Sequence, residues 1–226
     1  MGPMSETGDI EDLVRRVDPD RWLSSRFIAE PQARADVLAV YAFDHELARA
    51  PRVASNALLA EIRLTWWREA LEEIFEDRPA RAHPTVQALA EVVRRRGLSR
   101  AVMETMIDAR YRELDPAPIS ENELLDWARD TGGLAAQLAA QILDPATDAR
   151  LALAGGSAWA LGKRLEEMPA LRPTFLRVIH AARGASRALS VAAFPAVAHA
   201  ALAGRPTKAD FSRRLRLTIA VARGRI

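Results

Sequence analysis

Apolar side chains recur along most of the chain at the three- and four-residue spacing of amphipathic helices. Pro31 suits the first turn of a helix that is expected to continue to Ala50, where Pro51 interrupts the pattern. The next helix, capped by Ser55 and reaching about Glu76, carries two apolar stripes side by side: Leu59, Ile62, Trp66, Ala70 and Ile74, then Leu64, Trp67, Leu71 and Phe75. Two adjacent stripes make a wide apolar face, so we expect this helix to be central in the fold.

Caps and helix breakers delimit the remaining predicted helices, which cover residues 84–96, 99–115, 120–143, 146–167, 174–203 and, with Thr207 as its cap, 207–226. Ser120 and Glu123 match the capping box, in which each residue satisfies the other's free backbone group. The chain shows neither the alternation of half-buried strands nor hairpin dipeptides. We therefore predict a single all-helical domain over residues 1–226, with residues 1–9 as a flexible tail.

Two glycine pairs, Gly132-Gly133 and Gly155-Gly156, fall inside predicted helices. A glycine in a helix interior costs about 1 kcal/mol relative to alanine, so such pairs need a reason. A close approach between two helices is the favoured interpretation, and a local break that lines a cavity is the alternative.

Composition excludes several classes of protein. The chain has 226 residues, a formal net charge of +2 and no cysteine, which excludes disulfides and thiolate chemistry. Arginine supplies all but two of the 32 basic residues, yet so small a net charge argues against a general nucleic-acid binder. No apolar run approaches the length of a membrane span, and the N-terminus has no signal-peptide pattern. We expect a cytoplasmic protein without a transmembrane segment.

The polar residues do not form a recognisable metal site. Four histidines, His45, His83, His180 and His199, lie far apart in the sequence and are expected at the surface or hydrogen-bonded. Glu69, Glu72 and Glu73 lie close together opposite the tryptophan stripe, where a solvated face is the better interpretation. Asp108, Arg112 and Asp115, with Glu113 alongside, are expected to form an ion-paired ridge.

Three stretches of the chain carry recognisable motifs. Residues 41–49 read Tyr-Ala-Phe-Asp-His-Glu-Leu-Ala-Arg, residues 63–71 read Arg-Leu-Thr-Trp-Trp-Arg-Glu-Ala-Leu, and the third stretch is residues 107–114. They resemble, in this order, three parts of the squalene/phytoene synthase family: the helix that leads into its first aspartate motif, its Arg-Leu-x-Trp-Trp-Arg-x-x-Leu segment and the next helix. The order and spacing agree from about Asp18 to Leu165. The resemblance implies the all-α, single-domain isoprenoid synthase bundle, here shortened at its C-terminal end.

Working members of that family condense two prenyl diphosphates head to head, and two aspartate-rich motifs bind the magnesium that holds the diphosphates. The resemblance places the first motif at Ala48, Arg49 and Arg52, and the second at Trp159, Lys163 and Arg164. None of these six residues is a carboxylate, and magnesium needs oxygen ligands. We therefore expect neither a magnesium cofactor nor the standard chemistry.

The family also has a non-catalytic branch, the assembly factors of respiratory complex I. The Phe43-x-x-Glu46-Leu47-Ala48 pattern resembles that branch more than it resembles a synthase. The resemblance thus implies a pseudoenzyme with an assembly or scaffold role and a protein partner. A divergent prenyl transferase and a metal-free isoprenoid or lipid-binding protein are the alternatives, so enzyme activity stays open, with absence favoured.

Two further hypotheses concern ligands and membranes. If the two former motif segments face a retained cavity, its cations could hold a phosphate group directly; the candidate pocket residues are Tyr41, Arg49, Arg52, Arg63, Trp67 and Arg164. The alternative is a collapsed pocket with these side chains in solvent. Residues 174–203 are apolar enough to lie against a surface, which would place the protein peripherally at the inner membrane, although a packed helix is the favoured interpretation.

Overall fold

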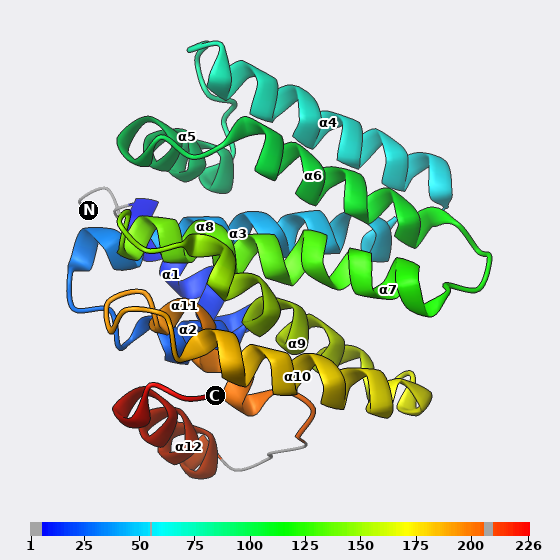
Figure 1. Cartoon of the computed structure of the whole chain (residues 1–226). Helices are drawn as coiled ribbons and strands as arrows, with labels where there is room; N and C mark the ends of the chain where they lie inside the picture. Colours follow the sequence, from blue (N-terminus) through cyan, green and yellow to red (C-terminus); the bar gives the residue numbers. More distant parts are fainter. Residues whose placement is uncertain (1–5, 55, 206–209) are drawn as a thin grey trace.

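The computed structural model describes residues 6–54, 56–205 and 210–226. In these parts of the chain the regular structure is helical and there is no strand (Figure 1). The first half contains α1 (Glu6–Val17), α2 (Pro19–Ser25), α3 (Pro31–Val53), α4 (Ala57–Phe75), α5 (Pro84–Arg96) and α6 (Arg100–Tyr111). The second half contains α7 (Glu121–Ala128), the π-helical turn η2 (Arg129–Gly133), α8 (Leu134–Leu143), α9 (Leu153–Arg164), α10 (Arg172–Ser186), α11 (Pro195–Ala198), the 3₁₀ turn η5 (His199–Leu202) and α12 (Asp210–Arg223). The predicted all-α fold is confirmed.

Local chemistry sets most helix ends where the sequence predicts them. Gly97 ends α5 with φ +60°, a conformation that glycine adopts without strain. The capping box of Ser120 and Glu123 is present at the start of α7. The expected stop at Pro51 is wrong, because α3 continues through it to Val53. A proline in the last turn removes a single backbone hydrogen bond, so the helix tolerates it there.

Asn56 is the N-cap of helix α4, and its side chain accepts a hydrogen bond from the backbone N–H of Leu59. The predicted cap Ser55 lies outside the described residues. Contrary to expectation, α4 lies at the edge of the molecule (Figure 1). One of its two stripes packs against α3, α5 and α6, with Leu64, Trp67 and Leu71 buried and Phe75 half-buried. The N-terminal part of the other stripe, with Leu59 and Ile62, is 42% and 54% exposed.

The C-terminal third departs most from the prediction. Residues 174–203 do not form one helix, since α10 ends at Ser186 and α11 starts only at Pro195. Residues 187–194 form turns and a bend instead of helix, and they separate the two helices. The predicted cap Thr207 lies outside the described residues. None of the described helices has both the length and the apolarity that a bilayer span requires.

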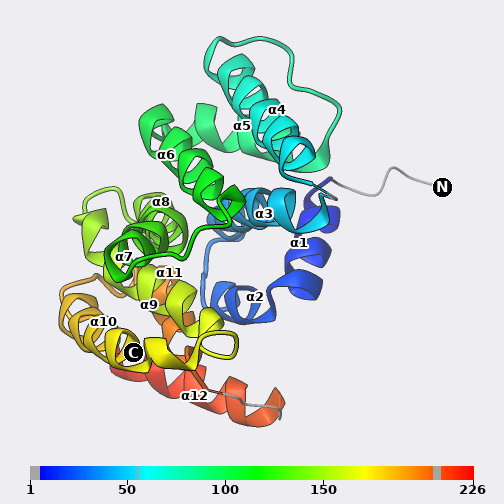
Figure 2. The same cartoon turned by 90° about the vertical axis from the view of Figure 1, so that its right-hand side faces the viewer.

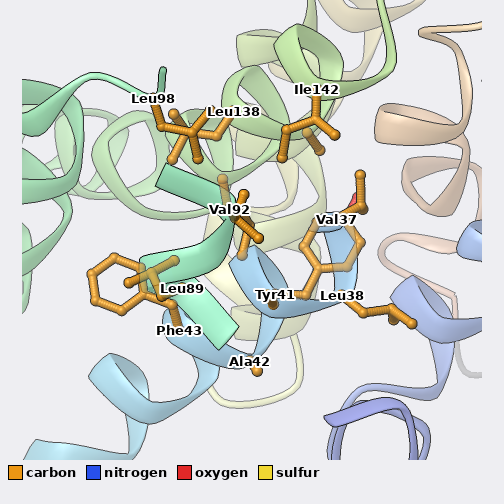
Figure 3. Close-up of a cluster of buried hydrophobic side chains, with 14 of the residues drawn as sticks. Val37, Leu38, Tyr41, Ala42, Phe43, Leu89, Val92, Leu98, Leu138 and Ile142 are labelled. Carbon is orange, nitrogen blue, oxygen red and sulfur yellow. The ribbon is translucent and has the colours of Figure 1, made fainter. Parts of the chain in front are cut away.

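Helix α3 forms the centre of the core. Val37, Val40, Phe43 and Leu47 have no exposed surface, and α1, α4, α5, α6 and α8 all pack against this helix. Figure 3 shows Val37 and Phe43 of α3 among side chains of α5 and α8. A helix that is apolar on nearly every side must be surrounded by others, which explains the position of α3.

The glycine pairs allow two segments to touch through their backbones. A Cβ atom added to Gly132 in η2 would lie 2.6 Å from the carbonyl oxygen of Gly156 in α9, and one added to Gly156 would overlap the backbone of Gly132. The predicted close approach is therefore present. The π-helical turn at η2 is also a local break, so both interpretations of the glycine pairs apply at this point.

Candidate functional site

A cavity of about 340 Å³ lies between α2, α3, η2 and α9. Figure 2 shows α2, α3, α7 and α9 grouped around the middle of the molecule. The charged side chains that line the cavity are Arg21, Arg52, Arg110, Lys163 and Arg164, against Asp18, Asp44 and Glu167. The lining therefore carries a net positive charge at neutral pH.

A buried ion triad forms the floor of the cavity. Asp44 of α3 accepts a hydrogen bond from Nη1 of Arg21 at 2.5 Å and from Nη2 of Arg110 at 2.6 Å. All three side chains are buried. Burial alone would raise the pKa of Asp44, but the two guanidinium groups outweigh it and hold that pKa at about 2. Asp44 is therefore an anion whose charge is neutralised by two arginines of the protein itself.

Local structure positions Arg21. Asp18 caps α2 by accepting from the backbone N–H of Arg21 at 3.3 Å, and its other oxygen lies 3.7 Å from the guanidinium. The guanidinium carbon lies 3.9 Å from the centre of the Trp159 ring and 4.8 Å from that of Tyr41. Burial opposes the charged form of Arg21, yet Asp44 and Asp18 raise its pKa above the ordinary value.

A second carboxylate, Glu113, links α6 to α9 at the side of the cavity. It accepts from Nη1 of Arg110 at 2.8 Å and from Nε1 of Trp127 at 2.9 Å. Arg164 lies 3.6 Å from its other oxygen and stacks over Trp127, 4.7 Å from the ring centre. This wall is therefore held together by charge pairs and cation–π contacts that involve no ligand.

Several buried polar atoms have no hydrogen-bond partner among the described residues. Six of them gather on the inner side of the cavity: Nε and Nη2 of Arg21, the hydroxyl of Tyr41, Nε1 of Trp159 and both ring nitrogens of His199. The other two are Nε of Arg110 and Nδ1 of His83. The rings of Tyr41 and Trp159 lie 6.0 Å and 5.4 Å from that of His199. Such atoms are uncommon in native proteins, and ordered water or a ligand is the usual explanation.

His199 contradicts the expectation that each histidine is at the surface or hydrogen-bonded. It is fully buried in η5. Burial, then the nearby charges of Arg21 and Lys163, lowers its pKa well below the ordinary value, so it is neutral at pH 7.

The two former motif segments meet across the cavity. Ala48 and Arg52 line it from α3, and Trp159, Lys163 and Arg164 line it from α9. Arg52 makes no ion pair with any described residue. Lys163 lies 3.7 Å from Asp18 and 4.1 Å from the centre of the Trp159 ring. Binding of an anion by these residues stays a prediction.

The other candidate pocket residues lie elsewhere. Arg49, Arg63 and Trp67 line a separate hollow of about 320 Å³ between α3 and α4. Arg49 also pairs with Glu46 at 3.3 Å. Tyr41 is buried beneath the cavity. The reason is helical periodicity, since neighbouring positions on α3 point to different sides of the helix.

Two of the three glutamates singled out on α4, Glu69 and Glu73, are paired with arginine. Arg81 contacts Glu69 at 2.9 Å and Glu73 at 2.7 Å, while its guanidinium lies over Trp66, 5.1 Å from the ring centre.

The expected ridge around Arg112 is only partly present. Arg112 lies 3.8 Å from Asp115, but Asp108 pairs with Arg68 across to α4. Glu113 points inward, as described above.

The donor set does not fit magnesium. Among the described residues, no group of three or more histidine or acidic side chains is placed to hold a metal ion. Asp18 and Asp44 are both paired with cations of the protein. A magnesium ion brought here would have to compete with guanidinium groups that are already in place.

Sequence reasoning missed Arg21, Asp44 and Arg110. An indication was present for two of them: Asp44 directly follows an apolar run, residues 37–43, and Arg110 follows Met103, Met106 and Ile107 on one helical face. A charge on a buried face must be paired, so each of the two residues predicts a buried partner of opposite charge without identifying it. His199 lies within an apolar run as well, residues 191–204, which indicates burial but not its neighbours.

Comparisons with known proteins agree with this architecture. The model of the squalene/phytoene synthase family matches residues 14–170. A crystal structure of a dehydrosqualene synthase in complex with a ligand superimposes with a TM-score of 0.72 at 15% identity, covering 96% of this chain and 95% of that chain. Squalene synthase HpnC from Alicyclobacillus acidocaldarius gives a TM-score of 0.69 at 15% identity, covering 97% and 94%. At such low identity these likenesses concern the fold alone.

The curated relatives are similar over a shorter region. NADH dehydrogenase (ubiquinone) complex I, assembly factor 6, from Rattus norvegicus is 32% identical over 134 residues, which is 58% of this chain. The same factor from Homo sapiens is 27% identical over 133 residues. In both cases the match covers 39% of the relative's own length. Since the family model spans well over half of the residues, this chain belongs to the squalene/phytoene synthase family.

Proposed function

We propose that this chain is a non-catalytic member of its family and acts as an assembly or scaffold protein for respiratory complex I, in the cytoplasm beside the inner membrane. The observation that carries the proposal is the charge of the cavity. Where a synthase needs free carboxylates for magnesium, this cavity presents five cations and paired acids.

The side chains at the positions of the magnesium ligands argue against head-to-head condensation. Loss of diphosphate develops negative charge, and bound metal ions stabilise that charge. The positions that the resemblance assigns to the ligands hold Ala48, Arg52 and Lys163 among others, which cannot ligate magnesium. We infer that this chain does not catalyse head-to-head condensation.

The assembly role is supported by the printed function of the curated relatives, the complex I assembly factors. Because the similarity spans 39% of their length, the role and its protein partner are transferred only as a proposal.

Deletion of the gene in the organism that encodes it tests the role. We expect less assembled complex I in membranes, measured by native gel and by NADH-dependent quinone reduction, and recovery on expression of the wild-type chain. The variant Arg52→Gln/Lys163→Gln should restore assembly equally well, because a scaffold does not need the cavity cations. Normal complex I together with the disappearance of a prenyl product would overturn the proposal.

A direct assay separates the enzyme alternative. The purified chain is incubated with farnesyl diphosphate and magnesium, beside a working squalene synthase as a positive control, and diphosphate release is measured. We expect no release above background. Magnesium-dependent release would show that a metal site survives.

A second candidate function, binding of an anionic isoprenoid or lipid without metal, is favoured by one specific observation. The cavity has five cationic residues, and unpartnered donors of Arg21 and Trp159 face its inner side. A ligand that binds only the native state raises its stability, by about 2.7 kcal/mol at a concentration one hundred times Kd. Thermal unfolding with farnesyl diphosphate and a chelator should then show a rise in melting temperature, reduced in Arg52→Gln/Lys163→Gln. No rise at saturating ligand would contradict this candidate.

A further inference from the structure

Helix α12 has two apolar faces, and only one of them is packed. Leu217 and Ala220 are 1% and 5% exposed and face α2, α11 and η5. Phe211, Leu215 and Ile219 on the other side are 77%, 49% and 41% exposed. Figures 1 and 2 show α12 at the edge of the molecule. A globular protein does not need this second face for its own core.

The exposed residues form one narrow stripe, called here the outer stripe (Phe211, Leu215 and Ile219). At 100° per residue they span about 80° of the helix surface and lie opposite the buried face. Arginines border the stripe on both sides, Arg214 on one and Arg216 with Arg223 on the other. From residue 211 to 226 the chain has no acidic residue.

The basic, apolar surface continues beside α12. A groove of about 670 Å³ along its C-terminal half is lined by Arg187, Arg223 and Arg225 and by no acidic residue. Val191, on the rim of this groove, is 91% exposed. Arg216 and the three arginines of the groove make no side-chain ion pair with any described residue.

A second groove, of about 570 Å³, lies between α12 and the segments around α1 and α2. Arg15, Arg26 and Arg214 line it together with Phe27. Its one acidic residue, Glu11, lies 3.5 Å from Arg26 and 3.1 Å from Arg34. Arginines of α12 and of neighbouring segments therefore line both grooves beside the outer stripe.

We propose that the outer stripe of α12 and its arginines dock this protein on the surface of an anionic phospholipid bilayer. Apolar side chains flanked on both sides by arginine are typical of helices that lie in the plane of a membrane. Phe211, Leu215 and Ile219 enter the boundary between headgroups and acyl chains. The arginines bind the lipid phosphates, to which guanidinium groups bond in a bidentate manner.

Charge complementarity selects lipid over a protein partner. The cations cover both flanks of the stripe and both grooves, which suits a laterally continuous layer of phosphates. The docking surface is distinct from the cavity between α3 and α9, and the inference does not depend on the proposed function.

Co-sedimentation of the full chain with vesicles tests the proposal. Vesicles contain phosphatidylcholine alone or with one third phosphatidylglycerol, at low and high salt. We expect binding to the anionic vesicles at low salt, weak binding to neutral vesicles, and weakening by salt. Phe211→Gln/Leu215→Gln/Ile219→Gln should lower the partition coefficient at least about tenfold. Arg216→Gln/Arg223→Gln should lower it by about fivefold for each charge at low salt.

The chain supplies matched controls. Leu58, Leu59 and Ile62 of α4 are 65%, 42% and 54% exposed, so their triple glutamine variant removes similar apolar surface elsewhere. Arg94→Gln/Arg129→Gln removes two half-exposed arginines outside α12. Both controls should bind vesicles like the wild type, and all variants should keep its melting temperature within a few degrees.

Three results would overturn the proposal: no binding to anionic vesicles, equal binding by the α12 variants, or equal loss in the control variants. Analytical ultracentrifugation covers the remaining case. Self-association that is lost in the outer-stripe variant, without vesicle binding, would assign this face to a second copy of the chain and overturn the lipid assignment.

Discussion

Replacement of Asp44 by asparagine tests whether the buried ion triad stabilises the fold. Asparagine keeps the shape of the side chain and removes its charge. The change leaves two buried guanidinium groups without their shared counter-ion. Arg110 retains Glu113 at 2.8 Å, whereas Arg21 retains only Asp18 at 3.7 Å.

The expected loss follows from these contacts. Removal of one partner from a buried charge pair costs about 3 to 5 kcal/mol, because the remaining charge stays desolvated. Total unfolding free energies are about 5 to 15 kcal/mol, so Asp44→Asn should be severely destabilised yet still measurable. Asp44→Asn/Arg21→Met should lose less than the sum of its single variants, since the unpaired charge is removed with its partner.

The pH dependence provides an independent test of the same triad. A pKa of about 2 in the folded protein, against an ordinary value of 3.8, is worth roughly 2 to 3 kcal/mol. Because the folded-state pKa is lowered, this stability is present above about pH 4 and is lost as the pH falls towards 2. The wild type should show this loss, and Asp44→Asn should lack the corresponding part of it.

Urea unfolding followed by circular dichroism measures both the unfolding free energy lost in Asp44→Asn and the dependence of stability on pH. Asp108→Asn is the matched control: Asp108 also pairs with an arginine, but its side chain is 60% exposed, and the change should cost at most about 1 kcal/mol. A loss below about 1 kcal/mol in Asp44→Asn, or an unchanged acid dependence, would refute the assignment of a stabilising buried triad.

Two further predictions concern packing and titration. Gly156→Ala should lose about 1 to 3 kcal/mol in urea unfolding, because the new Cβ would overlap the backbone of Gly132; Gly184→Ala, with nothing within 4 Å of its Cβ, should be neutral or up to about 1 kcal/mol more stable. Equal effects in the two variants would contradict the close backbone approach. His199 has a lowered pKa, so the unfolded chain binds a proton there first, and stability should fall as the pH drops below about 6.5. His199→Phe should remove that part of the pH dependence, measured by melting temperature from pH 8 to 5, and a profile identical to the wild type would exclude His199 as its source.

Local rules predicted the helices well where a side chain itself marks the end. Gly97 and the pair of Ser120 and Glu123 act through contacts within a few residues, so the sequence contains what is needed. Position in the fold depends on other helices. The stripes of α4 predicted a central helix, but Leu59 and Ile62 of one stripe are exposed, and no local pattern shows how many neighbours a helix will have.

The candidate site was predictable only in part, because local motifs identify segments but not the contacts between distant residues. The family resemblance named two segments, and the fold brings them to one cavity, where Ala48 and Arg52 lie across from Lys163. The triad below could not be located by spacing, because Arg21 and Arg110 are 23 and 66 residues from Asp44 in sequence. Their partnership exists only after α2, α3 and α6 have packed.

The triad also balances the charge at the floor of the cavity with the protein's own side chains. In a magnesium site, carboxylates that face each other repel until the ion arrives, and the empty site is held open at a cost. Here Asp44 is balanced by Arg21 and Arg110 within the protein. The cations nearer the opening, Arg52 and Lys163, are then the ones whose charge is least compensated. A ligand that enters this cavity therefore meets positive charge at the opening and a neutralised floor below, the reverse of what a hydrated cation requires.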